Sequence, residues 1–79
     1  MADECNDWES WFDRHGPALV LLARARVPTR ADAEDVVQVA FVRFWRARGR
    51  AADPTAYLFG CVRRCALEWI RARGRRARR

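Results

Sequence analysis

The sequence is poor in the residues that catalysis uses. It contains one histidine, His15, and one serine, Ser10, and it has no glycine-rich loop that could cradle a phosphate group. Its carboxylates cluster near the starts of predicted helices, where they stabilise the helix dipole. These absences argue against an enzyme, so the sequence predicts a binding protein that needs no cofactor.

Long hydrophobic runs and paired cysteines are also missing. The longest apolar run, Pro17 to Ala23, is far shorter than the roughly 20 residues that cross a bilayer. Acidic residues stand at the first positions, where a secretory signal would be basic. Three cysteines are an odd number and too few for a disulfide framework. We therefore expect a soluble cytoplasmic protein with reduced thiols and no membrane partner.

A metal site is the one cofactor hypothesis that the cysteines raise. Cys61 and Cys65 lie one helical turn apart, and His15 and Cys5 would complete four ligands. Both thiols of the pair, however, fall on a predicted buried face, where free cysteine behaves as a small hydrophobic residue. We expect structural thiols and no bound metal.

Charge is distributed unevenly along the chain. Residues 1–40 hold four arginines against eight acidic residues, and residues 41–79 hold twelve against two, so the halves carry −4 and +10 and sum to +6. No lysine is present. A basic second half predicts a polyanionic partner, with nucleic acid the first candidate and an anionic membrane surface the second.

The 79 residues, 51% of them hydrophobic, suffice for one small domain, and the spacing of the apolar residues predicts that it is all-α with three helices. The first helix is expected over about 7–26, with Asp7 as a possible cap and a kink or restart at Gly16–Pro17. Val27–Pro28 ends it. Its predicted buried residues are Trp8, Phe12, Leu19, Leu22 and Ala23.

The second helix is expected to start at Thr29, which with Asp32 resembles a capping box, and to end at Gly49. Its predicted buried stripe is Ala33, Val36, Val37, Ala40, Phe41 and Phe44. The opposite face carries two exposed valines among polar side chains, which is typical of a shallow protein-docking patch or of scattered surface residues. That face consists of Asp35, Gln38, Val39, Val42 and Arg46.

The third helix is expected from Pro54, with Asp53 as its cap, to about Arg73, after a loop over about 50–52. Its predicted inward residues are Leu58, Cys61, Val62, Cys65 and Trp69, and its basic outer face carries Gly60, Arg63, Arg64, Leu67 and Arg71. The six arginines of 71–79 predict a frayed helix end or a disordered tail.

A basic helix face with aromatic residues nearby favours nucleic-acid binding. Tyr57 and Phe59 could stack on bases, although core packing is the alternative for each. Long helices with a proline-containing turn and a loop between them favour a platform for single strands over a helix-turn-helix.

Two segments resemble a known family. ADAEDVVQVAFVRFWR at 31–46 and DPTAYLFGCVRRCALEWIRARGRR at 53–76, with WFDRHGPALVLLARARV at 11–27, are similar to region 2 of bacterial RNA polymerase sigma factors, most of all the extracytoplasmic-function group. The resemblance implies a helical domain that docks on the clamp helices of core RNA polymerase. It also implies recognition of the promoter minus-ten element and capture of its single-stranded non-template strand, and it leaves an anti-sigma factor as a further partner.

The family's functional positions fall on both predicted surfaces. The clamp-binding positions match Asp35, Gln38, Val39, Val42 and Arg46, and the DNA-binding positions match Arg48, Arg50, Asp53, Tyr57, Arg63, Arg64, Glu68 and Arg71. Val39 replaces the family's usual acid, and Gly60 and Arg64 replace a basic residue and an asparagine.

We expect a single region 2 domain, ordered over about 7–73, with 74–79 as a basic tail or the start of a linker and no second, minus-thirty-five-reading domain. Two alternatives remain open. One is a generic basic helical module for nucleic acid, and the other is a decoy that binds polymerase or an anti-sigma factor. Substitutions on the two faces separate these alternatives.

Overall fold

Three α-helices and one short 3₁₀-helix make up the part of the chain that the structure describes. The computed structural model describes residues 8–77, with side chains as far as Arg75. Helix α1 spans Trp8–Arg24, α2 spans Arg30–Ala47, the 3₁₀-helix η2 spans Arg48–Arg50, and α3 spans Pro54–Ala77. No strand occurs over this range, so the predicted all-α fold is confirmed. Asp7, the predicted cap of the first helix, lies outside the described residues.

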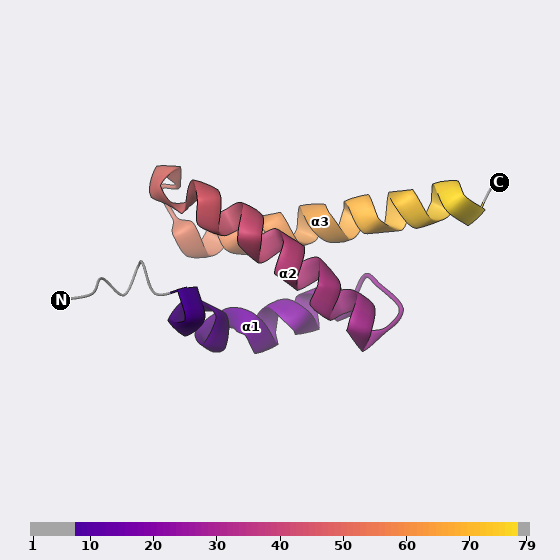
Figure 1. Cartoon of the computed structure of the whole chain (residues 1–79), viewed down its shortest axis with the longest axis horizontal. Coiled ribbons are helices and arrows are strands. Elements are labelled where there is room, and N and C mark those ends of the chain that lie inside the picture. The colour runs from indigo at the N-terminus through magenta and orange to yellow at the C-terminus, as the bar shows by residue number, and fades with distance from the viewer. Residues whose placement is uncertain (1–7, 78–79) are drawn as a thin grey trace.

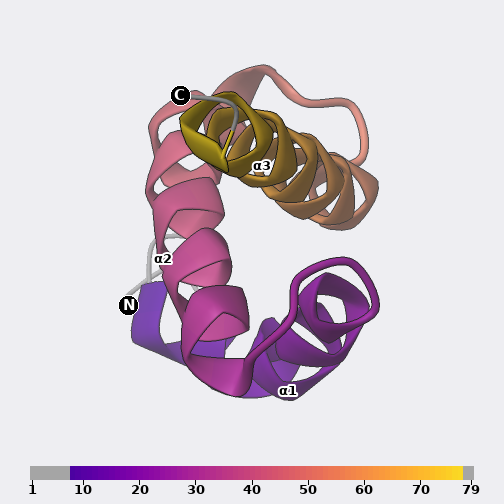
Figure 2. The ribbon, with the colours of Figure 1, turned by 90° about the vertical axis from the view of Figure 1, so that its right-hand side faces the viewer.

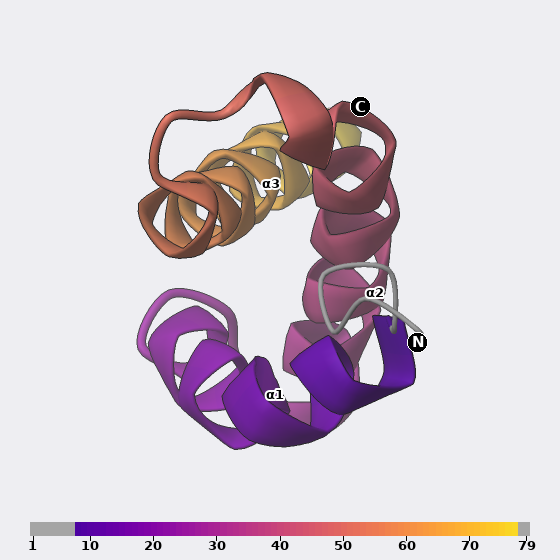
Figure 3. The same ribbon diagram turned by 90° about the vertical axis from the view of Figure 1, so that its left-hand side faces the viewer.

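Helix α2 packs against both of the other helices with one face. It crosses diagonally over α1 and α3 in Figure 1, and the end-on views in Figures 2 and 3 show α1 and α3 on the same side of α2, toward its opposite ends. The predicted stripe of α2 is buried in full, and it joins apolar residues of both neighbours in one core. Among the described residues no polar or charged side chain is buried, so burial of apolar surface holds the three helices together.

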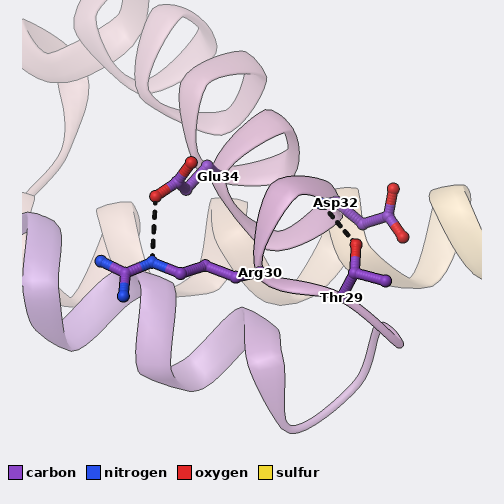
Figure 4. A network of polar contacts seen from close by, with 4 residues as sticks. All are labelled: Thr29, Arg30, Asp32 and Glu34. Carbon is purple, nitrogen blue, oxygen red and sulfur yellow. Dashed lines mark hydrogen bonds and ion pairs between the residues drawn. The ribbon is translucent and has the colours of Figure 1, made fainter.

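The start of α2 is fixed by the predicted cap. Thr29 has an extended backbone, and its Oγ1 accepts a hydrogen bond from the Asp32 amide at 3.1 Å (Figure 4). The next residue, Arg30, forms an exposed pair with Glu34, with 3.1 Å between Nε and Oε2. A solvent-exposed pair of this kind contributes about 1 kcal/mol at most. The cap is therefore the stronger signal for where α2 begins.

The first helix runs without interruption through Gly16 and Pro17, so of the two predicted alternatives the restart is wrong. Pro17 lacks the amide that would bond the preceding turn, which favours bending rather than a break. The helix ends at Arg24, two residues early, and the amides of Arg26 and Val27 both donate to the Ala23 carbonyl in the following turn.

Two tryptophans predicted to be buried are not. Trp8 is 46% exposed because it stands in the first turn of α1, at the edge of the core, where only part of its ring covers Phe41 and Phe12. Trp69 is partly buried, with the Arg73 guanidinium carbon 5.2 Å from its ring centre. Both tryptophans therefore lie at the edge of the core and not inside it.

The ends of the other helices also differ from the sequence prediction. Helix α2 ends at Ala47 rather than at Gly49, because η2 takes over at Arg48. Helix α3 continues to Ala77, four residues beyond the predicted end, and its last turns extend past α2 in Figure 1. Alanine and arginine are among the best helix formers, and they sustain these turns in spite of Gly74 and the like charges.

Candidate functional site

The predicted docking residues of α2 share one exposed face. Val39 and Val42 are 49% and 45% exposed, which is high for valine on a helix whose other valines are buried. Gln38, directly before Val39 in sequence, is also exposed. The α2 docking face is hereafter this set of exposed residues: Asp35, Gln38, Val39, Val42 and Arg46.

Two hollows flank the α2 docking face. One, of about 380 Å³, opens beside α1, and the other, of about 240 Å³, opens beside α3. Each combines apolar walls with carboxylates, so the face is a ridge between two depressions that can receive side chains of a partner. The α1-side hollow is lined by Trp8, Glu9, Phe12, Asp13, Gln38 and Val42, and the α3-side hollow by Asp35, Val36, Val39, Cys65, Glu68 and Trp69.

Glu68 belongs to the contact between α2 and α3. Its Oε1 accepts a hydrogen bond from Arg43 Nη1 at 2.9 Å, and this bond is the main cause that raises the pKa of Arg43. Glu68 also lines the α3-side hollow together with Val39. The structure thus brings Glu68 next to the α2 docking face, although the family resemblance placed it among the DNA-binding positions.

Cys61 and Cys65 lie on the buried stripe of α3, as predicted, and both are free thiols. Burial is the largest cause that raises the pKa of Cys65, against the opposing charge of Arg43, whose Nη1 lies 3.4 Å from Sγ. Within residues 8–77 no three histidine, cysteine or acidic side chains gather as metal ligands would. Cys5, the fourth ligand of the zinc hypothesis, lies outside the described residues.

The arginines of the predicted DNA-facing surface are exposed on α3. Arg63, Arg64 and Arg71 all project into solvent, and Leu67, between them, is 45% exposed. Arg63 and Arg64 are adjacent in sequence, so they diverge by about 100° around the helix axis. The two guanidinium groups therefore cover a wide arc and can contact different phosphates.

The loop from α2 to α3 is anchored at both ends. At its start, Arg48 Nη1 donates to the Trp45 carbonyl, and the guanidinium carbon lies 3.8 Å from the centre of the indole ring. At its end, Asp53 Oδ1 accepts from the Ala56 amide at 3.2 Å, which confirms Asp53 as the cap of α3. Of the predicted loop contacts, only Arg50 is an exposed arginine.

Tyr57 stands in the first turn of α3, next to this loop. It is 37% exposed, and its ring centre lies 6.2 Å from that of Phe44 in the core. One part of the ring is thus held by the core while the rest is open to a stacking partner. Phe59, the other predicted stacking residue, is instead partly buried and contacts His15 across the helices at 6.3 Å.

Most of the aromatic side chains form one connected cluster next to the loop of 48–53, which was not predicted from the sequence. Eight of the nine aromatic side chains, with His15, form one connected set of ring contacts 5.1 to 6.3 Å apart. Trp45, on which Arg48 stacks, belongs to it and was missed because helical spacing assigned it to neither face. The members are Trp8, Trp11, Phe12, Phe41, Phe44, Trp45, Tyr57 and Phe59.

His15 is the member of this cluster that can gain a charge as the pH falls. Burial between Trp11 and Phe59, and to a lesser degree the charge of Arg14, lowers the pKa of His15 below its ordinary 6.5. Below pH 6.5 the unfolded chain therefore binds a proton before the folded chain does, and stability falls with falling pH until the folded-state pKa is passed. We expect the urea midpoint to be lower at pH 5.5 than at pH 7.5.

The control for this pH effect is His15→Phe, which keeps a ring between Trp11 and Phe59 but cannot be protonated. Its urea midpoint should change much less between the two pH values. An equal fall in both proteins would assign the effect to the carboxylates and not to His15.

Comparison with protein families identifies the domain that carries these two surfaces. The model of the sigma-70 region 2 family matches residues 11–76, which include nearly all of the three helices. The chain belongs to the sigma-70 region 2 family. No curated protein and no solved structure matches it.

Membership in the sigma-70 region 2 family assigns the chain a role in transcription initiation. Region 2 of a sigma factor works with core RNA polymerase and promoter DNA, and the family is not one of enzymes. Among the described helices of this sigma region 2 domain, none has an apolar stretch that could cross a membrane.

Proposed function

We propose that the chain is region 2 of a sigma factor of the extracytoplasmic-function group, acting in the cytoplasm. It docks on the clamp helices of core RNA polymerase through the α2 docking face. With the loop of 48–53 and the outer face of α3 it recognises the promoter minus-ten element and captures the non-template strand as the duplex opens. The observation that carries the proposal is the separation of an exposed, partly apolar face on α2 from an arginine face on α3.

Docking through α2 is supported by what the face exposes. Two valines at about half exposure, each beside a hollow, offer apolar surface that a partner would remove from water. Exposed apolar surface of this kind, rimmed by polar side chains, is typical of interaction sites. Carboxylates of Asp13 and Asp35 border the two hollows and favour a partner with basic side chains.

Capture of a single strand is supported by the pairing of charge with an anchored aromatic ring. Arg63 and Arg64 supply the phosphate contacts, which act on every sequence. Tyr57 supplies a ring on which an unpaired base can stack, worth about 1 to 3 kcal/mol per base. The domain therefore need not pull the strands apart, because it stabilises the open form by holding one strand.

The experiment is fluorescence anisotropy with a labelled minus-ten non-template oligonucleotide and a scrambled one, with and without core polymerase. We expect weak binding by the domain alone and tight, sequence-dependent binding only with polymerase. Tyr57→Ala should reduce the difference in affinity between the minus-ten oligonucleotide and the scrambled one. Equal affinity for both in the presence of polymerase would contradict the proposal and favour a generic nucleic-acid module.

Neutralising Arg63 and Arg64 together should weaken binding to every oligonucleotide and flatten its salt dependence. On a single strand, each lost phosphate contact reduces the slope of log affinity against log salt by about 0.7. The same salt series with Arg63→Gln/Arg64→Gln measures this loss.

The matched control is Arg24→Gln/Arg26→Gln, which removes the same charge from exposed positions at the end of α1. The control should keep the parent's slope. A slope that changes equally in both double variants would mean that overall charge, and not the α3 face, determines binding. DNA affinity unaffected by the α3 substitutions, with polymerase still bound, would favour the decoy alternative.

A further inference from the structure

We propose that Arg48 is a positioning residue for base selection rather than a contact to DNA phosphate. By stacking on Trp45 it holds the loop of 48–53 in the shape that places a captured base beside Tyr57. The inference rests on the proposed function, since it concerns the same loop, and it assigns to Trp45 a role that the family positions carried over from the sequence do not include.

The stack ties the start of the loop to the core. The Arg48 guanidinium carbon lies 3.8 Å from the centre of the Trp45 ring, which is van der Waals contact. On α2 the Trp45 ring in turn stacks on Phe41, with 6.0 Å between centres and 14° between planes. Phe41 is fully buried. The guanidinium is thus joined through one ring to the centre of the hydrophobic core.

Two hydrogen bonds accompany the stack. We call Arg48 and Trp45 together the clasp. Nη1 of Arg48 donates to the carbonyl of Trp45, and the carbonyl of Arg48 accepts from the Ala51 amide at 3.3 Å, which closes the turn of η2. The same residue therefore holds its neighbours by its side chain and by its backbone. The clasp fixes both the direction in which α2 ends and the first turn of the loop.

The far end of the loop is held independently. The Asp53 carboxylate accepts from the Ala56 amide, and the Asp53 carbonyl accepts from the Tyr57 amide at 3.0 Å. Between the clasp and this cap lie only four residues, 49–52, of which Gly49, Arg50 and Ala52 are exposed. A segment this short with both ends fixed has few conformations left, so it is arranged before a base arrives.

Arginine is the side chain that this geometry requires. A planar guanidinium can lie flat on an indole and donate an in-plane hydrogen bond at the same time, whereas a lysine ammonium has no plane with which to stack. Trp45 covers one face of the Arg48 guanidinium, and the Trp45 carbonyl accepts a hydrogen bond from Nη1. Less of the guanidinium therefore remains for a phosphate contact. Charge toward DNA is then supplied by exposed Arg50, and Arg48 supplies geometry.

The test compares Arg48→Lys with Arg50→Gln in the anisotropy assay with core polymerase and both oligonucleotides. Arg48→Lys keeps the charge and loses the stack, so we expect the ratio of minus-ten to scrambled affinity to fall by about 2- to 30-fold, the size of a cation–π contact, with the salt slope unchanged. Arg50→Gln should lower the slope by about 0.7 and keep the ratio. Trp45→Leu should lower the ratio as Arg48→Lys does, and the double variant should lower it no further.

A second measurement is independent of DNA. In Arg48→Lys the Ala51 amide should exchange its hydrogen faster, while amides inside α2 and α3 keep the parent's rates. An unchanged exchange rate of the Ala51 amide in this variant would contradict the proposal that the clasp holds the loop. An Arg48→Lys variant that discriminates as the parent does would overturn its role in selection. If Arg48→Lys binds both oligonucleotides more tightly than the parent, Arg48 instead covers a surface of Trp45 on which a base can stack. A parent protein that fails to discriminate with polymerase present contradicts the proposed function, and the exchange rates then still decide the clasp.

Discussion

Phe41→Ala is expected to unfold the domain. The Phe41 ring is fully buried at the centre of the aromatic cluster, with ring centres of Trp8, Phe12, Phe44 and Trp45 5.2 to 6.0 Å away. Removing a buried phenylalanine costs about 3 to 5 kcal/mol, through lost transfer energy and the cavity left behind. A domain as small as this one has a total stability near the lower end of the usual range of about 5 to 15 kcal/mol.

Chemical denaturation followed by circular dichroism measures this effect. Val42→Ala, one residue away on the exposed side of the same helix, serves as the control and should shift the free energy of unfolding by about 0.5 kcal/mol or less. The loss of unfolding free energy in Trp69→Ala should lie between the losses in Phe41→Ala and Val42→Ala, because Trp69 is only partly buried. An unchanged midpoint for Phe41→Ala would contradict the observed packing.

Gln38→Ala combined with Val42→Asp is expected to abolish binding to core RNA polymerase. Both side chains are exposed on α2 and both line the α1-side hollow, so the new charge would be buried without a partner when the face docks. Neither side chain supports the core. Pull-down of polymerase should therefore be lost while helicity by circular dichroism is retained.

The matched control is Leu21→Asp, which places the same charge on α1 at a position that is 73% exposed and lines neither hollow beside the α2 docking face. This variant should bind polymerase as the parent does. A double variant that still binds as well as the parent would mean that α2 is not the docking face, and that the family relationship extends to the fold but not to this contact.

Local signals in the sequence predicted much of the fold. Thr29 and Asp53 cap the helices that the sequence assigned to them, and the period of α2 correctly separated the buried Phe41 from the exposed Val42. Each of these signals acts within one or two helical turns. A cap needs a side chain three residues from its amide, and a helical stripe needs only regular spacing.

Contacts between helices were not predictable in this way. Glu68 pairs with Arg43, 25 residues earlier, and nothing in the α3 sequence says that its partner is on α2 rather than on DNA. Trp8 also lies on the correct stripe, yet its place at the edge of the core depends on where α2 crosses α1. Helical spacing identifies a face, but it does not identify what covers that face.

Arg48 illustrates a different limit. The sequence shows a charge in the loop, and charge near a nucleic-acid surface favours phosphate contact. In the structure its guanidinium stacks on Trp45, three residues earlier, at the point where α2 gives way to η2. Spacing of three residues along a helix makes Trp45 and Arg48 neighbours, but it does not show whether the guanidinium covers the ring or extends toward DNA.

In the complex that we propose, α2 faces polymerase while the loop of 48–53 and α3 face DNA. The most direct test places a photoreactive amino acid at position 42 or position 57, assembles the domain with core polymerase and the minus-ten oligonucleotide, and identifies what each position crosslinks. We predict that position 42 crosslinks to the polymerase and position 57 to the oligonucleotide. Crosslinks with the partners exchanged, or position 42 reacting with DNA alone, would contradict the account.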